Sequence, residues 1–120
     1  MAKKSEQAQP KIVHANEGAK INYEFDGNRL TLGDDELTVN IERHERDDAN
    51  HIDVCRHRLG SLVMGVIPGT AEAYVAQLDI PPREYDYISD GFDDEGNPKE
   101  VKMPIPFDIG KCTLTLWALV

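Results

Sequence analysis

The segment from His51 to His57 holds the side chains best suited to chemistry. Its sequence, His-Ile-Asp-Val-Cys-Arg-His, alternates polar with mostly apolar residues. Alternate side chains of a β-strand share one face, so every second residue of this segment would project to the same side. Imidazole, thiolate and carboxylate are all ligands that Zn²⁺ accepts. The spacing raises the hypothesis of a zinc site with four candidate ligands: His51, Asp53, Cys55 and His57.

The same strand face has a second interpretation, which the sequence favours. If Ile41 shares the core side with Ile52, then Glu42 and His44 join the polar face. A face rich in both charges is typical of a solvated, charge-paired hairpin, whose exposed ion pairs contribute little stability. The spacing also matches no structural zinc motif. The surrounding charges are Arg43, Arg46, Arg56 and Arg58, with Glu42, Glu45, Asp47, Asp48 and Asp53.

Cys55 and His57 could also pair as nucleophile and base in a small hydrolase or transferase, because they are two residues apart. Nothing else in the sequence supports that reaction: it has no G-x-S-x-G elbow, P-loop or G-x-G-x-x-G fingerprint. A small buried cysteine is the better interpretation of Cys55. We therefore predict no catalytic residues, no cofactor other than the hypothetical zinc, and a protein that is not an enzyme.

A second polar region lies further along the chain, where six carboxylates fall within residues 84–95. Ca²⁺ takes several oxygen ligands, but the EF-hand register fails here. With Gly96 at the invariant glycine, Gly91 would take position one and Lys102 position twelve. Neither residue supplies a carboxylate, so ordinary turn chemistry is favoured. Four aromatic residues could form a platform that binds a sugar, although cross-strand packing is their usual role; they are Tyr85, Tyr87, Phe92 and Trp117.

Composition restricts the class of protein. The 120 residues, 40% hydrophobic and 29% charged, suit one globular domain. A net charge of −9 offers no basic footprint, so we predict no nucleic-acid partner. The N-terminus lacks a signal-peptide core and no apolar run could span a bilayer, so we predict no membrane association. With two unpaired cysteines, the expected location is the cytoplasm, or a particle assembled there.

Period-two alternation predicts an all-β fold with about eight short strands and little or no helix. Residues 71–80 are compatible with two helical turns, but their alternation favours a strand. A continuous apolar run at 62–67 predicts a strand buried on both faces. Short strands at regular spacing favour a small antiparallel β-sandwich, with a barrel as the alternative. The other predicted strands cover residues 21–25, 29–32, 37–42, 51–55, 84–88, 99–107 and 112–119.

The predicted organisation is a flexible leader at residues 1–10 and a single β domain at 11–120, with a long acidic hairpin at 84–107. Pro104 and Pro106 lack N–H groups on the same side, which predicts an edge strand there.

The loose leader, the long hairpin and the apolar last strand favour a non-enzymatic structural or assembly module. It would act with a protein partner or by self-association, for instance as a subunit of a larger particle such as a phage virion. The alternatives are a ligand-binding domain for a divalent metal or a carbohydrate and, less favoured, the Cys–His hydrolase.

Overall fold

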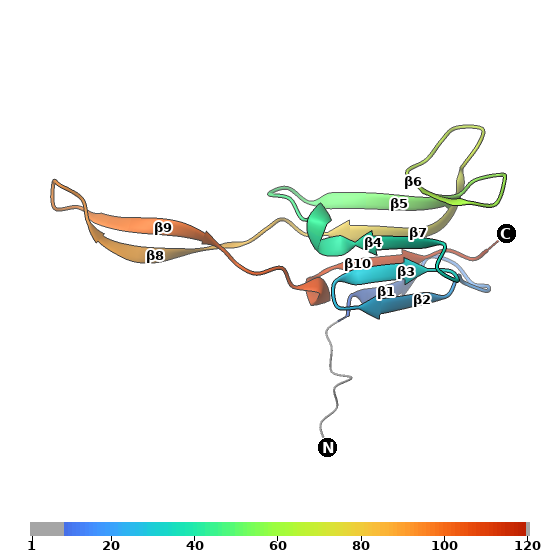
Figure 1. The fold of residues 1–120 in the computed structure, drawn as a ribbon, viewed down its shortest axis with the longest axis horizontal. Coiled ribbons are helices and arrows are strands. Elements are labelled where there is room, and N and C mark those ends of the chain that lie inside the picture. Colours follow the sequence, from blue (N-terminus) through green and yellow to red (C-terminus); the bar gives the residue numbers. More distant parts are fainter. Residues whose placement is uncertain (1–8, 120) are drawn as a thin grey trace, which may run out of the picture.

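The chain folds into ten β-strands and two short 3₁₀ helices, as a computed structural model that describes residues 9–119 shows (Figure 1). The all-β prediction is confirmed. The predicted leader falls mostly on residues 1–8, which lie outside the described residues. The strands are β1 (Lys11–His14), β2 (Tyr23–Asp26), β3 (Arg29–Leu32), β4 (Leu37–Asn40), β5 (Asn50–Arg56), β6 (Leu62–Met64), β7 (Ala73–Ile80), β8 (Tyr85–Phe92), β9 (Pro98–Pro104) and β10 (Thr113–Leu116), and the helices are η2 (Ile41–His44) and η3 (Ile109–Lys111).

The strands form three sheets. A five-stranded sheet has the order β1-β10-β7-β5-β6, a three-stranded sheet has the order β2-β3-β4, and β8 and β9 pair alone. All pairs are antiparallel except β1 with β10. The five-stranded sheet is therefore mixed, whereas the prediction was a sandwich of antiparallel strands only. The pairing partner of β1 lies about a hundred residues away in sequence, and local alternation carries no information about such a partner.

The two larger sheets pack face to face around one apolar core, as predicted for a sandwich, and they do not close into a barrel. Leu30 and Leu32 of β3 come from one sheet, and Leu78 of β7 and Leu114 of β10 come from the other. Each of these four side chains is at most 1% exposed. Among the described residues no polar or charged residue is buried as a whole, so apolar contact holds the layers together.

Two predicted strands are wrong in part. Residues 41–44 form the 3₁₀ helix η2, so Glu42 and His44 do not extend the polar face of a strand. The run 62–67 is a strand only at Leu62–Met64 and is not buried on both faces, since Val66 and Ile67 are more than 40% exposed. Gly65 ends this strand with φ of 105°, a conformation that side chains disfavour. The strand preferred over a helix at 71–80 is confirmed as β7.

Within the segment 84–107, β8 and β9 pair as an antiparallel hairpin, which projects from the sandwich along the long axis of the molecule (Figure 1). The molecule measures 64 × 46 × 23 Å. Asp93 closes the hairpin turn, because its carboxylate accepts hydrogen bonds from the backbone N–H groups of Glu95 and Asn97. Within residues 9–119 no helix has the length and apolar character needed to cross a bilayer.

Candidate functional site

His51 lies on the outer face of the five-stranded sheet, held between two carboxylates. Its Nδ1 is 2.6 Å from an oxygen of Asp79 on β7, and its Nε2 is 2.7 Å from an oxygen of Asp53 on its own strand. The sheet places them there because His51 and Asp79 are direct cross-strand partners, and Asp53 follows two residues later on the same face. Both ring nitrogens are therefore already engaged.

The polar contacts continue across the same face. The Gln77 amide donates to the Asp53 carboxylate at 2.9 Å, and the Trp117 indole N–H donates to the Gln77 carbonyl at 2.8 Å. The Trp117 ring also packs on Tyr74, with the ring centroids 5.4 Å apart. These contacts join β5, β7 and Trp117, the residue that follows β10, into one network that orients its members.

The two carboxylates set the ionisation of His51. The hydrogen bond to Asp79 raises the pKa of the imidazole, partial burial opposes this, and the bond to Asp53 adds to the increase. Partial burial acts to raise the pKa of Asp53, but hydrogen bonds from Gln77 and His51 outweigh it and leave that pKa below its ordinary value. Both shifts favour an imidazolium held between carboxylates.

This arrangement predicts a pH-dependent contribution of His51 to stability. Because the folded-state pKa is raised, the contribution is complete below the unfolded value of about 6.5 and is lost as pH rises through the folded-state pKa. The side chain is 47% exposed, so we expect at most about 1 kcal/mol. Urea unfolding of the wild type and of His51→Gln, at pH values below and above about 6.5, measures this contribution to stability. His57→Gln is the control. A wild-type advantage that stays constant with pH would contradict the assignment.

The other two predicted zinc ligands do not join His51 and Asp53 as the hypothesis requires. Cys55 is fully buried, and burial raises the pKa of its thiol, with the Asp53 charge adding to the increase. His57 follows the end of β5, and its Nδ1 accepts the backbone N–H of Leu59 at 3.0 Å. No three His, Cys, Asp or Glu side chains within residues 9–119 form a metal-binding group. Zinc binding stays an untested prediction, and so does the Cys55–His57 hydrolase.

Sequence reasoning missed Asp79, the closest partner of His51. It lies 28 residues from His51, in the segment 71–80, whose sequence is compatible with either a helix or a strand. The alternation of Leu78 and Ile80 with Asp79 could have placed it on a polar strand face. Only the pairing of β7 with β5 puts that face beside His51.

The β8–β9 hairpin (residues 85–104) is the second candidate region. Every residue of both strands except Tyr85 is exposed. On one face, Tyr87 is 62% and Phe92 71% exposed, and the Lys102 ammonium lies 4.1 Å from the centre of the Tyr85 ring. This face therefore presents aromatic rings directly to solvent.

The opposite face of the hairpin is aliphatic. Ile88 and Val101 are cross-strand partners, 51% and 39% exposed, and Met103 beside them is 44% exposed. Lys99 and Asp90 flank this group as an ion pair at 4.0 Å. Within the described chain, neither face of the hairpin packs on the sandwich, so both faces are exposed to solvent.

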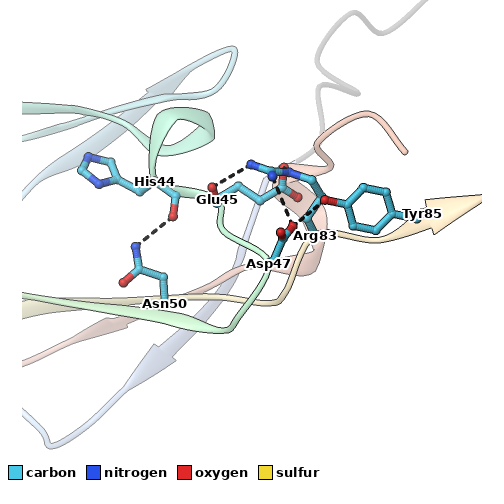
Figure 2. A network of polar contacts seen from close by, with 6 residues as sticks. All are labelled: His44, Glu45, Asp47, Asn50, Arg83 and Tyr85. Carbon is cyan, nitrogen blue, oxygen red and sulfur yellow. Dashed lines mark hydrogen bonds and ion pairs between the residues drawn. The ribbon is translucent and has the colours of Figure 1, made fainter. Parts of the chain in front are cut away.

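The base of the hairpin is fastened to the sandwich by a charged network (Figure 2). Arg83 donates to the backbone carbonyl of Glu45 at 3.0 Å and to the carboxylate of Asp47 at 3.2 Å. The Tyr85 hydroxyl donates to the same carboxylate, and this bond is the main reason that the pKa of Asp47 is lowered. A further ion pair joins Lys111 to Glu84 at 2.6 Å.

Backbone contacts tie the first end of the hairpin to the body of the molecule and join the second end to the first. Arg83 precedes β8, and its backbone N–H also donates to the Arg46 carbonyl at 2.7 Å. Ile105 follows β9, and its N–H donates to the Glu84 carbonyl at 2.8 Å. Asn50 supports the loop beneath them by donating to the His44 carbonyl at 2.8 Å (Figure 2). The network therefore fixes the direction in which the exposed hairpin leaves the sandwich.

Two regions thus stand out: a closed polar network on the sheet and an open hairpin held at its base. The first satisfies its own polar groups, whereas the second exposes apolar ones. No protein family, curated protein or solved structure matches this chain.

Proposed function

We propose that this protein is a non-enzymatic assembly module whose β8–β9 hairpin binds a protein partner, as a subunit of a larger particle such as a phage virion would. The observation that carries this proposal is the exposure of apolar side chains on both faces of the hairpin. Exposed apolar groups gathered on one element are typical of interaction surfaces. A two-stranded hairpin alone is also only marginally stable in water, so a partner that covers it would stabilise it.

The fastening at the hairpin base supports the same function. A binding element loses less conformational entropy on meeting its partner when it is already oriented. Arg83 and Tyr85 hold the first residues of the hairpin against Asp47. The hairpin would therefore meet its partner in a defined orientation.

The network around His51 gives less support to a ligand-binding or catalytic function. A metal ligand needs a free ring nitrogen, and a general base needs one that can reach a substrate. Both nitrogens of His51 are within 2.7 Å of a carboxylate oxygen. Either role would require His51 to give up one of these contacts.

Site-specific photo-crosslinking tests the proposal. With p-benzoylphenylalanine in place of Phe92, irradiation of the cells that naturally produce the protein should give an adduct of discrete mass. The matched control carries the same group at Tyr23, an aromatic residue on β2 that is 39% exposed. An adduct at position 92 and none at position 23 is the expected result. Failure to crosslink at position 92 would refute the proposal.

A further inference from the structure

The hairpin is strongly acidic. Residues 85–104 contain six acidic and two basic side chains, and three of the acids lie in the turn between the two strands. Its exposed apolar residues therefore lie within a negative field, which favours a partner surface that combines apolar groups with positive charge. The acids are Asp86, Asp90, Asp93, Asp94, Glu95 and Glu100, and the bases are Lys99 and Lys102.

The same chain carries a surface of that kind at its opposite end. Residues 54–71 contain no Asp or Glu, although the whole chain has 22 of them. This acid-free segment includes β6 and the loops on either side of it. It lies at the far end of the long axis from the hairpin (Figure 1). Its exposed apolar residues are Leu59 at 82%, Met64 at 43%, Val66 at 41% and Ile67 at 44%.

The positive charge of the acid-free segment comes mainly from Arg58. Arg56 is already paired with Glu36 at 2.6 Å, so its charge is offset locally. The Arg58 side chain is exposed, and its backbone N–H is bonded to the Thr70 carbonyl at 2.8 Å, which holds the two loops of the segment together. An exposed cation thus lies beside exposed Leu59.

Free strand edges occur at both ends. In the described chain β6 is an outer strand of the five-stranded sheet, and β8 pairs only with β9. Each keeps backbone N–H and C=O groups on one edge that another strand can bond. β9 has proline at both of its ends, whereas β8 has none. β8 is therefore the better hairpin edge for adding to a sheet.

We propose that the β8–β9 hairpin of one copy docks on the acid-free segment of a second copy, an inference that rests on the proposed assembly function. The two complementary surfaces lie at opposite ends of the molecule, so they meet only between copies. Such a head-to-tail contact is heterologous and repeats from copy to copy, giving a ring if the rotation closes and a filament if it does not. Residues 85–104 reach the roughly 20 residues a side that a specific interface uses.

The net charge of −9 does not prevent this contact. At physiological ionic strength charges are screened beyond about 8 Å, so the repulsion between the bodies of two copies is weak. At the contact itself, the hairpin acids face Arg58. Two carboxylates from outside the segment also reach it, but both are engaged: Glu36 pairs with Arg56 at 2.6 Å, and Glu72 accepts the backbone N–H of Gly69 at 2.7 Å. A hairpin-to-hairpin contact would instead place six acids of one copy against six of another.

A complementation experiment tests the head-to-tail contact. One variant alters the hairpin (Phe92→Ser with Asp94→Lys), and a second alters the acid-free segment (Leu59→Ser with Arg58→Glu). Both change exposed residues, so circular dichroism should confirm that each stays folded. Glu24→Lys, an exposed position on β2, is the control for a change of charge. Sedimentation velocity over a concentration series reports the oligomeric mass of each variant and of their mixture.

We expect the wild type and the Glu24→Lys control to form oligomers, and each double variant alone to stay monomeric. A mixture of the two variants should form a dimer and stop there, because one intact hairpin meets one intact acid-free segment. A monomeric wild type would overturn the head-to-tail contact, while crosslinking at position 92 would still uphold a different partner. Oligomers lost in the hairpin variant but not in the segment variant would also overturn it and keep the assembly function. Oligomers that persist in both variants would count against both.

Discussion

Leu114→Ala is expected to lower the free energy of unfolding by about 2–5 kcal/mol, the range for removing a fully buried leucine side chain. Leu114 is 0% exposed and lies on β10, between β1 and β7. Its neighbours on those strands, Ile12 and Leu78, cannot move to fill the space without breaking the strand pairing. Domains of this size are stable by only about 5–15 kcal/mol, so the loss is severe. Urea denaturation followed by circular dichroism measures it.

The matched control is Leu59→Ala, the same chemical change at a side chain that is 82% exposed. It should alter the unfolding free energy by no more than about 0.5 kcal/mol. If the two variants lost similar stability, the packing of the two sheets around β10 described above would be incorrect.

Replacing residues 87–102 with Asn-Gly is expected to leave the sandwich folded and to abolish self-association. Asp86 and Met103 are cross-strand partners, and a two-residue Asn-Gly turn suits such a pair. The change removes no residue of the buried core. Replacing 16 residues by two shortens the loop by three halvings, each worth about 0.6 kcal/mol of closure entropy, so the unfolding free energy should shift by about 2 kcal/mol or less. Urea denaturation and sedimentation velocity measure the two effects.

Full-length protein with the single change Phe92→Ser separates loss of the hairpin surface from loss of chain length. It should weaken association without changing stability. A shortened chain that fails to fold would show that the hairpin stabilises the sandwich. A shortened chain that still associates would show that the contact lies elsewhere on the molecule.

Much of the fold could be predicted because strand alternation is local. Leu30 and Leu32 alternate with polar residues, and their burial on one face of β3 follows directly. The hairpin was predictable for the same reason, since Asp93 and Gly96 supply turn chemistry between two strand-like runs. The errors arise where the sequence pattern continues past the end of strand pairing: alternation continues into Ile41 and Glu42, and the apolar run continues to Ile67.

The candidate zinc site was predictable only in part. The common face of His51 and Asp53 follows from their spacing, and they do share a hydrogen bond. The burial of Cys55 depends on how β7 and β6 pack beside β5, where the register with β7 shifts between Val54 and Cys55. His57 falls beyond the last residue of the strand, so its spacing from Cys55 no longer fixes its direction.

The sequence by itself determined which side chains share a face in strands such as β3, where most turns lie, and that the hairpin is acidic while residues 54–71 lack acids. These properties depend on neighbours a few residues away. The tertiary structure alone decided that β1 runs parallel to β10, that Asp79 meets His51, and that the hairpin and the acid-free segment lie at opposite ends. Such relations join residues distant in sequence, and their choice depends on the free energy of the whole packed chain rather than on any local pattern.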